Sequence, residues 1–248
     1  MDLQSFFQQH QRAAIAFSGG VDSAYLLYAA LAWGKEIQPY YVKSAFQPQF
    51  ELDDALRLCE RLHVPLKVLS LDVLADDMVR INPKDRCYYC KRRIFSLIAA
   101  TARADGYEVL LDGTNASDDA SDRPGMRALE ELQVLSPLRL CGISKSEVRQ
   151  RSREAGLFTW DKPAYACLAT RIPTGEPITM EALDATEKGE ALLMALGFRD
   201  IRIRRMKGCA RLQVPKDQMA LVLEKRCEIV QGLKPWYSAV MLDLEDRG

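Results

Sequence analysis

A glycine-rich turn between an apolar run and an amphipathic helix is the feature that most constrains how this chain can fold. Residues 13–17 are all apolar, which is typical of a parallel strand that is buried on both faces. The turn Ser-Gly-Gly-Val-Asp-Ser follows at 18–23, and apolar residues at helical spacing continue to Leu31. A strand, a turn and a helix are therefore predicted in direct succession. The first N–H groups of such a helix and its positive dipole end attract an anion.

The residue types in this turn indicate a phosphate-bearing ligand. Gly19 and Gly20 let the backbone approach a ligand closely, whereas Asp22 would repel a bare phosphate and suits Mg²⁺ held between phosphates. The turn lacks the Gly-Lys-Ser/Thr ending of P-loop kinases and GTPases, and it resembles the pyrophosphate loop of the ATP pyrophosphatase superfamily. An ordinary strand–helix turn is the alternative. The residues predicted to bind the nucleotide here are Ser18, Gly19, Gly20, Val21, Asp22 and Ser23.

The overall composition narrows the class of protein. The 248 residues are 48% hydrophobic and 27% charged, which is ordinary for a globular protein. The formal net charge is zero, which argues against a nucleic-acid partner. We see no membrane span and no secretory signal, so we expect a cytoplasmic protein whose seven cysteines are reduced.

Strand and helix patterns alternate along the first part of the chain. Apolar runs and amphipathic periods predict strands at 37–43, 66–71 and 109–111 and helices at 50–63, 92–103 and 145–156. Residues 138–140 are also strand-like, and Ser-Lys-Ser-Glu at 144–147 reads as a capping box for the helix at 145–156. This alternation predicts an α/β fold with a doubly wound, mostly parallel sheet. Ligands of such sheets bind at the carboxyl ends of the strands. We therefore expect the sequence Asp-Gly-Thr-Asn, which follows the last strand, to join the glycine turn in one crevice, and Thr114, Asn115 and the nearby Arg123 to bind nucleotide.

A proline- and glycine-rich stretch that ends at Pro177 reads as a linker, and the order of predicted strands and helices changes after it. We expect a first domain over 1–172 and a smaller α+β domain over 173–248. Its predicted elements are helices at 179–196 and 216–231, hairpin strands at 201–205 and 210–214, and a last strand within 237–244.

Three cysteines stand apart from the others. Cys87 and Cys90 form a Cys-x-x-Cys pair just before a predicted helix, and Cys167 lies in an irregular stretch beside the cationic Lys162 and Arg171, which would favour a thiolate. The pair alone fits half a zinc site, a redox dithiol or two incidental thiols. Three thiolates together could hold a [4Fe-4S] cluster with one iron open to a further ligand.

Arg202 and Arg204 alternate with isoleucines, so both guanidinium groups leave one face of a predicted strand. A solvated strand face is the ordinary interpretation of such charge. The alternative is a bidentate clamp on a phosphate group.

Over nearly its whole length the chain resembles the LarE family of ATP-dependent sulfur transferases, within the ATP pyrophosphatase (PP-loop) superfamily. The segments that carry this resemblance are 18–23, 83–91, 112–115, 122–125, 136–138, 160–175 and 201–204. The resemblance implies ATP-dependent sulfur insertion into a pyridinium dicarboxylate mononucleotide during synthesis of the nickel-pincer cofactor of lactate racemase. It also implies Mg²⁺, a 5′-phosphate clamp at Arg202 and Arg204, catalytic Asp22 and Cys167, and a homo-oligomer such as a hexamer.

The sulfur source divides the family. In one type the cysteine that matches Cys167 gives up its own sulfur, and in the other three cysteines hold a [4Fe-4S] cluster. Because Cys87, Cys90 and Cys167 are all present, we favour the cluster type as the cofactor prediction. Gln213 stands where the family resemblance predicts glutamate, so a metal or oligomer contact that needs this carboxylate is not expected here. A tRNA-thiolating enzyme, an amide-forming synthetase and a nucleotide-sensing module are the alternatives.

Overall fold

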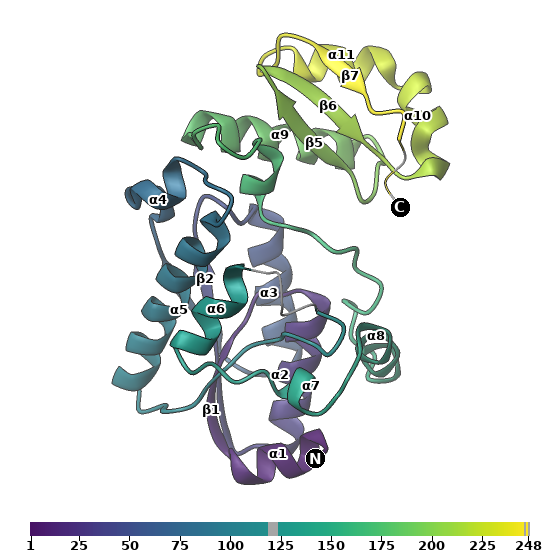
Figure 1. Ribbon diagram of the computed structural model, residues 1–248. Coiled ribbons are helices and arrows are strands. Elements are labelled where there is room, and N and C mark those ends of the chain that lie inside the picture. Colours follow the sequence, from purple (N-terminus) through teal and green to yellow (C-terminus); the bar gives the residue numbers. More distant parts are fainter. Residues whose placement is uncertain (119–123, 246, 248) are drawn as a thin grey trace. The chain divides into compact units, whose positions relative to one another are not determined.

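The computed structural model describes residues 1–118, 124–245 and 247, and the chain divides into two compact units (Figure 1). The first unit comprises 1–73 and 85–162, and the second comprises 74–84 and 163–248. The second unit therefore takes in two segments that precede the expected boundary at residue 172. In the part of the chain that is described, no helix is long and apolar enough to cross a membrane.

The first unit is built on four parallel strands in the order β3-β2-β1-β4. The strands are β1 (Arg12–Ala16), β2 (Glu36–Lys43), β3 (Lys67–Ser70) and β4 (Leu110–Leu111). Side chains alternate between the two faces, so Ile15 packs in one core cluster and Ala14 in another. The predicted parallel α/β sheet is confirmed, and its central strand is apolar because helices cover it on both sides.

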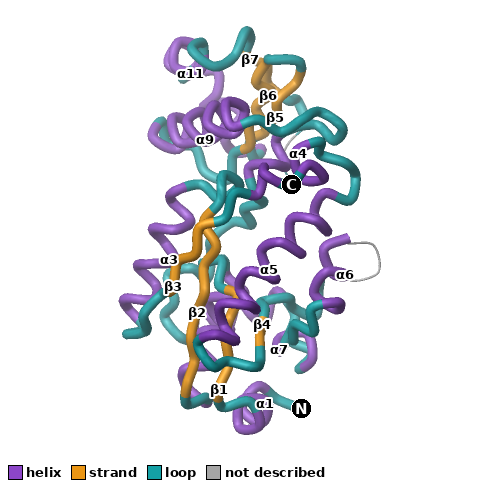
Figure 2. Tube along the Cα trace, turned by 90° about the vertical axis from the view of Figure 1, so that its left-hand side faces the viewer, coloured by secondary structure: helices purple, strands orange, loops and turns teal. Residues whose placement is uncertain are grey.

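Helices flank this sheet in two layers, and Figure 2 shows α3 and α5 on opposite sides of the strands. One core cluster includes residues of α1 (Leu3–Gln9), α2 (Val21–Trp33), α3 (Gln49–Arg61), α7 (Pro137–Leu140) and α8 (Lys145–Glu154). The other includes residues of α5 (Arg86–Ala104) and α6 (Pro124–Glu131). Since helices lie on both faces, the sheet is doubly wound, as predicted.

The second unit has a three-stranded sheet in the order β5-β6-β7. Strands β5 (Arg202–Met206) and β6 (Cys209–Gln213) form the predicted antiparallel hairpin, and β7 (Val240–Leu242) pairs parallel to β6. Its helices are α4 (Asp77–Arg80), α9 (Met180–Ala195), α10 (Met219–Glu224) and α11 (Arg226–Leu233), with 3-10 turns at Leu168–Arg171 and Lys216–Gln218. The predicted small α+β architecture is confirmed.

Asn82 connects the segment 74–84 to the rest of the second unit. It is buried, adopts a positive φ of 58°, and its side-chain amide donates to Pro173 O at 2.8 Å and Glu176 O at 3.1 Å. Gly175 N donates back to Asn82 O at 2.8 Å. An asparagine tolerates this left-handed conformation, and the hydrogen bonds of its side-chain amide offset the backbone strain.

Three local predictions were wrong. Helix α5 begins at Arg86, so the Cys-x-x-Cys pair lies inside its first turns, because Arg86 and Cys90, four residues apart, already pack inward at helical spacing. The predicted helix at 216–231 is broken at Lys225, whose ψ of 13° departs from helical geometry. The segment Pro137–Leu140 is a short helix and not a strand.

Candidate functional site

The glycine turn has a conformation that requires glycine. Gly19 has a φ of 72°, and a Cβ there would lie 3.1 Å from Ala55 Cβ and 3.2 Å from Glu51 O of α3. The hydroxyls of Ser18 and Ser23 lie 3.1 Å apart across the turn, and Ser23 Oγ also donates to Gly20 O at 3.2 Å. The positive φ of Gly19 and these hydrogen bonds thus fix the conformation of the turn at the start of α2.

The loop after β4 meets this turn at the carboxyl ends of the strands. A Cβ on Gly113 would lie 2.8 Å from Ser23 N, so only glycine permits this approach. Asn115 Nδ2 donates to Asp22 Oδ1 at 3.1 Å. The structure therefore brings Asp22, Ser23 and Asn115 together.

Thr114 belongs to a buried network within the same loop. Its hydroxyl donates to Asp112 Oδ2, and Ser136 Oγ donates to Asp112 Oδ1, both at 2.5 Å. The Thr114 hydroxyl thus holds the loop in shape through a carboxylate. The predicted Arg123 lies outside the described residues.

Lys145 is a site residue that the sequence analysis placed only in a capping box. Its ammonium group forms an ion pair with Asp22 Oδ2. The box itself is present, because Ser144 N donates to Glu147 Oε2 at 2.9 Å and Ser144 Oγ accepts from Glu147 N. The first turn of α8 thus places the ammonium group of Lys145 next to the glycine turn, where this group can bind phosphate oxygens. A lysine directly after the helix cap Ser144 is the signal that could have found it.

The Cys-x-x-Cys pair lies on α5 of the first unit in basic surroundings. Cys87 is exposed and Cys90 is buried, and Arg86 Nη2 lies 3.7 Å from Cys87 Sγ. Two guanidinium groups lie near the ring of Tyr88, with the Arg127 Cζ atom 3.7 Å and the Arg92 Cζ atom 5.3 Å from the ring centroid. Cys87 is therefore the more accessible cysteine of the pair, and a guanidinium group lies beside it.

Cys167 lies in the second unit at the start of a 3-10 turn. Its carbonyl accepts hydrogen bonds from Thr170 N at 3.0 Å and from Thr170 Oγ1 at 2.9 Å. The side chain is half-buried. The turn therefore fixes the backbone at Cys167 while leaving part of its side chain accessible.

A buried ion pair lies next to residues 164–170, which we call the Cys167 loop. Arg171 Nε and Nη2 donate to the Glu190 carboxylate at 2.8 and 3.1 Å, and both side chains are at most 1% exposed. The same carboxylate accepts from Tyr165 O–H at 2.5 Å and from Ile203 N at 2.9 Å. Burial acts to lower the pKa of Arg171, but the hydrogen bonds and charge of Glu190 outweigh it and raise that pKa. The pair joins the Cys167 loop to α9 and β5.

Arg202 and Arg204 lie on the same face of β5, as predicted, and both face the Cys167 loop. Arg202 Nη2 donates to Ala164 O, and Arg204 Nη1 donates to Thr170 O. Arg202 is only 2% exposed, so the interpretation of a solvated strand face is wrong for this residue. Burial, and then the neighbouring guanidinium groups of Arg171 and Arg247, lower the pKa of Arg202 to about 10, which leaves it charged at neutral pH.

The three cysteines of the predicted cluster are divided between the units, since Cys87 and Cys90 lie in the first and Cys167 in the second. Among the described residues, no group of three or more His, Cys, Asp or Glu side chains is arranged to hold a metal ion. The cluster therefore stays a prediction.

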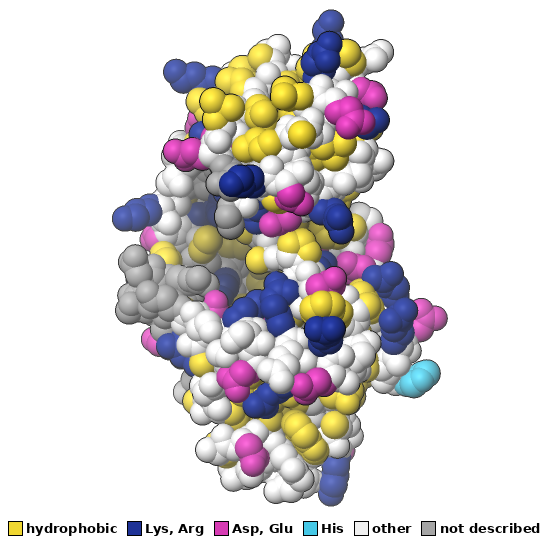
Figure 3. All heavy atoms as spheres, turned by 90° about the vertical axis from the view of Figure 1, so that its right-hand side faces the viewer, with side chains coloured by type: hydrophobic (Ala, Val, Ile, Leu, Met, Phe, Trp, Pro, Cys, Tyr) yellow, Lys and Arg dark blue, Asp and Glu magenta, His cyan; other side chains and the backbone are white. Residues whose placement is uncertain are grey.

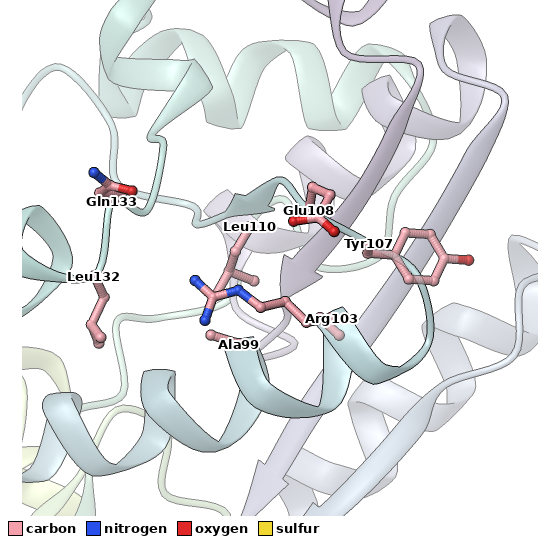
Figure 4. Close-up of a pocket in the computed structure, with 8 residues that line it drawn as sticks. Ala99, Arg103, Tyr107, Glu108, Leu110, Leu132 and Gln133 are labelled. Atoms are coloured by element: carbon pink, nitrogen blue, oxygen red, sulfur yellow. The ribbon is translucent and has the colours of Figure 1, made fainter.

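A pocket in the first unit lies away from these loops, at the amino end of β4 (Figure 4). Its lining residues are Ala99, Ala102, Arg103, Tyr107, Glu108, Leu110, Leu132 and Gln133. Because nucleotides bind at the carboxyl ends of parallel strands, this pocket is not the candidate nucleotide site.

Comparisons with known proteins identify relatives of this chain. Residues 12–79 match the family described as queuosine biosynthesis protein QueC. An uncharacterised protein of Synechocystis sp. is 36% identical over 250 residues, covering 98% of this chain and 92% of that protein. The pyridinium-3,5-bisthiocarboxylic acid mononucleotide synthase of Lactiplantibacillus plantarum is 32% identical over 208 residues, covering 83% and 75%. A tRNA-specific 2-thiouridylase of Thermotoga sp. is 23% identical over 248 residues, covering 79% and 69%.

Proposed function

The chain belongs to the family of the pyridinium-3,5-bisthiocarboxylic acid mononucleotide synthase (LarE), a family of ATP-dependent sulfur transferases, and we propose that it acts on the same class of substrate. In this proposal it replaces a carboxylate oxygen of a pyridinium dicarboxylate mononucleotide by sulfur, during synthesis of a nickel-pincer cofactor. ATP is consumed to AMP and pyrophosphate, because a carboxylate oxygen leaves only after adenylation.

One observation carries the proposal: two arginines of β5 contact the loop that presents Cys167. Arg202 donates to Ala164 O and Arg204 donates to Thr170 O, on either side of the cysteine. A 5′-phosphate bound by these guanidinium groups would bring the rest of the mononucleotide close to Cys167. This juxtaposition of an anion clamp and a thiol supports sulfur transfer to a nucleotide.

The loops of the first unit support the adenylation step. The substrate carboxylate attacks the α-phosphorus of ATP, the α–β phosphoanhydride bond breaks, and pyrophosphate leaves with the electron pair. The N–H groups at the start of α2 would stabilise the departing pyrophosphate. Asp22 would hold Mg²⁺, and Lys145, which now pairs with Asp22, would then turn to the phosphates. Sulfur next adds to the acyl carbonyl carbon, and AMP leaves.

We propose a [4Fe-4S] cluster as the sulfur source, with cysteines of both units as its ligands. Cys87 and Cys90 lie one turn apart on α5, and a guanidinium nitrogen lies 3.7 Å from Cys87 Sγ. With Cys167 as third ligand, a bound cluster would supply sulfide on an open iron. The alternative is donation by Cys167 itself, for which the other two cysteines are not needed.

We also infer a homo-oligomer that forms through the second unit. Figure 3 shows hydrophobic side chains gathered on one face of this unit. Its exposed apolar side chains include Leu223 and Val230, which are 64% and 51% exposed. Burial of such groups against a second copy would be favourable, and light scattering of the purified chain measures the assembly.

The test is a reaction with protein purified without oxygen. The dicarboxylate mononucleotide and Mg-ATP are added, and AMP, pyrophosphate and the thiocarboxylate product are measured. Pyrophosphate release that requires the mononucleotide is expected, and its absence would refute the proposal. Cys167→Ala should abolish product, whereas Cys227→Ala, which changes an exposed cysteine of the same unit, should not.

The same samples distinguish the two sulfur sources. About four irons per chain, lost in Cys87→Ala and in Cys167→Ala, would support the cluster. Absence of iron, with a protein that becomes lighter by one H₂S after reaction, would identify Cys167 as the donor.

A further inference from the structure

Gln213, at the end of β6, connects an arginine of β5 to an aspartate after β7. Its Oε1 accepts from Arg204 Nε at 3.0 Å, and its Nε2 donates to Asp243 Oδ2 at 2.9 Å. A guanidinium only donates and a carboxylate only accepts. The side chain at 213 must therefore accept on one side and donate on the other, which an amide can do and an ionised carboxylate cannot.

The remaining contacts of Arg204 indicate which atom can reach a ligand. Nε is held by Gln213, and Nη1 donates to Thr170 O of the Cys167 loop. Within the described ranges, no residue accepts a hydrogen bond from Nη2 of Arg204. With two of its nitrogens held by the protein, the guanidinium has a set orientation in which Nη2 can donate to an anion.

We propose that Gln213 is a positioning residue for phosphate recognition: it orients the guanidinium of Arg204, and its neutral amide preserves the positive charge of that site. The inference rests on the proposed function, in which Arg204 binds the 5′-phosphate of the substrate. It assigns a role to the glutamine that stands where the family resemblance predicts glutamate.

The charges around Gln213 explain why neutrality matters. Arg202 and Arg204 face it from β5, Arg211 lies on β6, and Asp243 follows β7 with its Oδ2 3.5 Å from Arg211 Nε. A carboxylate at 213 would stand about 3 Å from both Arg204 and Asp243, by substitution into the present contacts. This carboxylate would neutralise the guanidinium of Arg204, which is proposed to bind the phosphate, and it would repel the carboxylate of Asp243.

The experiment compares Gln213→Glu with the wild-type full-length protein. The probes are nicotinic acid mononucleotide, a pyridinium carboxylate mononucleotide, and the matching nucleoside without phosphate. We expect the variant to bind the mononucleotide about tenfold more weakly at pH 7.5, with nucleoside binding unchanged. As the pH falls, the new carboxyl group at 213 and that of Asp243 share one proton. The protonated group can then donate to the other, so the hydrogen bonds that link Arg204, residue 213 and Asp243 form again. The ratio of variant to wild-type Kd should therefore shrink toward pH 5.5.

Two further variants separate positioning from a general effect of charge or folding. Gln231→Glu adds the same charge on an exposed position of α11 and should leave both Kd values unchanged. The double variant Gln213→Glu with Asp243→Asn keeps the net charge, but residue 243 now donates the hydrogen bond and residue 213 accepts it. Two carboxyl groups are no longer adjacent, so the Kd of this variant should depend on pH no more than that of the wild type.

The possible failures are distinguishable. If the wild type binds nucleoside and mononucleotide equally, Arg204 does not bind the phosphate, and the inference falls together with that part of the proposed function. If the wild type prefers the mononucleotide and Gln213→Glu retains this preference at both pH values, the inference alone is overturned, even where the variant is less stable to heat.

Discussion

Replacing Glu190 by glutamine tests whether the buried ion pair holds the Cys167 loop in place. The Glu190 carboxylate accepts two hydrogen bonds from Arg171 and one each from Tyr165 and Ile203 N. Glutamine keeps the size but removes the charge, so a guanidinium that is 0% exposed is left without its counter-ion. Breaking a buried pair in this way costs about 3–5 kcal/mol. That is a large share of the ~5–15 kcal/mol by which domains are stable.

Urea unfolding measures this loss in the second unit. Trp236 is the tryptophan of that unit, so Trp33 and Trp160 are first replaced by phenylalanine to make the fluorescence report on it alone. With a urea slope of about 1–3 kcal/mol per M, the midpoint for Glu190→Gln should fall by more than ~1 M. A looser loop should also let iodoacetamide alkylate Cys167 faster.

The same helix offers a matched control. Asp184 and Lys188 form an exposed ion pair on α9 at 2.7 Å, with both side chains 54% exposed. Such a pair contributes less than about 1 kcal/mol, so Asp184→Asn should hardly move the midpoint. Adding Arg171→Met to Glu190→Gln removes the unpaired charge and should recover part of the loss. If Glu190→Gln costs no more than Asp184→Asn, the pair does not stabilise the loop.

Other predictions concern the first unit. Lys145→Ala should slow ATP–pyrophosphate exchange about a hundredfold, because the leaving group loses a cation, and unchanged exchange would exclude this role. Burial raises the pKa of the Cys59 thiol to about 12, so Cys59 should resist alkylation at pH 8 until urea unfolds the protein, whereas the exposed Cys87 should react at once, as peptide mass mapping would show. The hydrogen bond from Lys67 lowers the pKa of Asp105, so the stability that it contributes is present above about pH 4 and is lost as the pH falls further. Lys67→Ala should flatten this part of the stability–pH curve, and an unchanged slope would contradict the assignment.

Local patterns along the chain were sufficient to predict much of the fold. The apolar run at 13–17 and the turn after it encode a buried strand and a helix start, because burial and turn chemistry act on neighbouring residues. The capping box at 144–147 is another local signal, and the structure confirms it. Alternating periods of two and 3.6 residues then imply a parallel sheet covered on both faces.

Local patterns failed where packing decided the outcome. The start of α5 depends on contacts with α6, where Tyr88 O–H donates to Glu131 and its ring stacks on Arg127, so the Cys-x-x-Cys pair lies further inside a helix than its sequence indicates. The helix predicted at 216–231 is interrupted at Lys225, although its residues suit a continuous helix.

Local sequence patterns specify the class of fold, the glycine turn at 18–23 and the cysteines available for chemistry. The residues that contact these features come together only when the chain is folded. Lys145 meets Asp22 across 123 positions, and Arg204 meets Thr170 across 34. Gln213 meets Asp243 across 30 positions. Hydrogen bonds and ion pairs form between groups a few ångströms apart in space, and the spacing of residues along a chain does not specify that distance until strands and helices have packed.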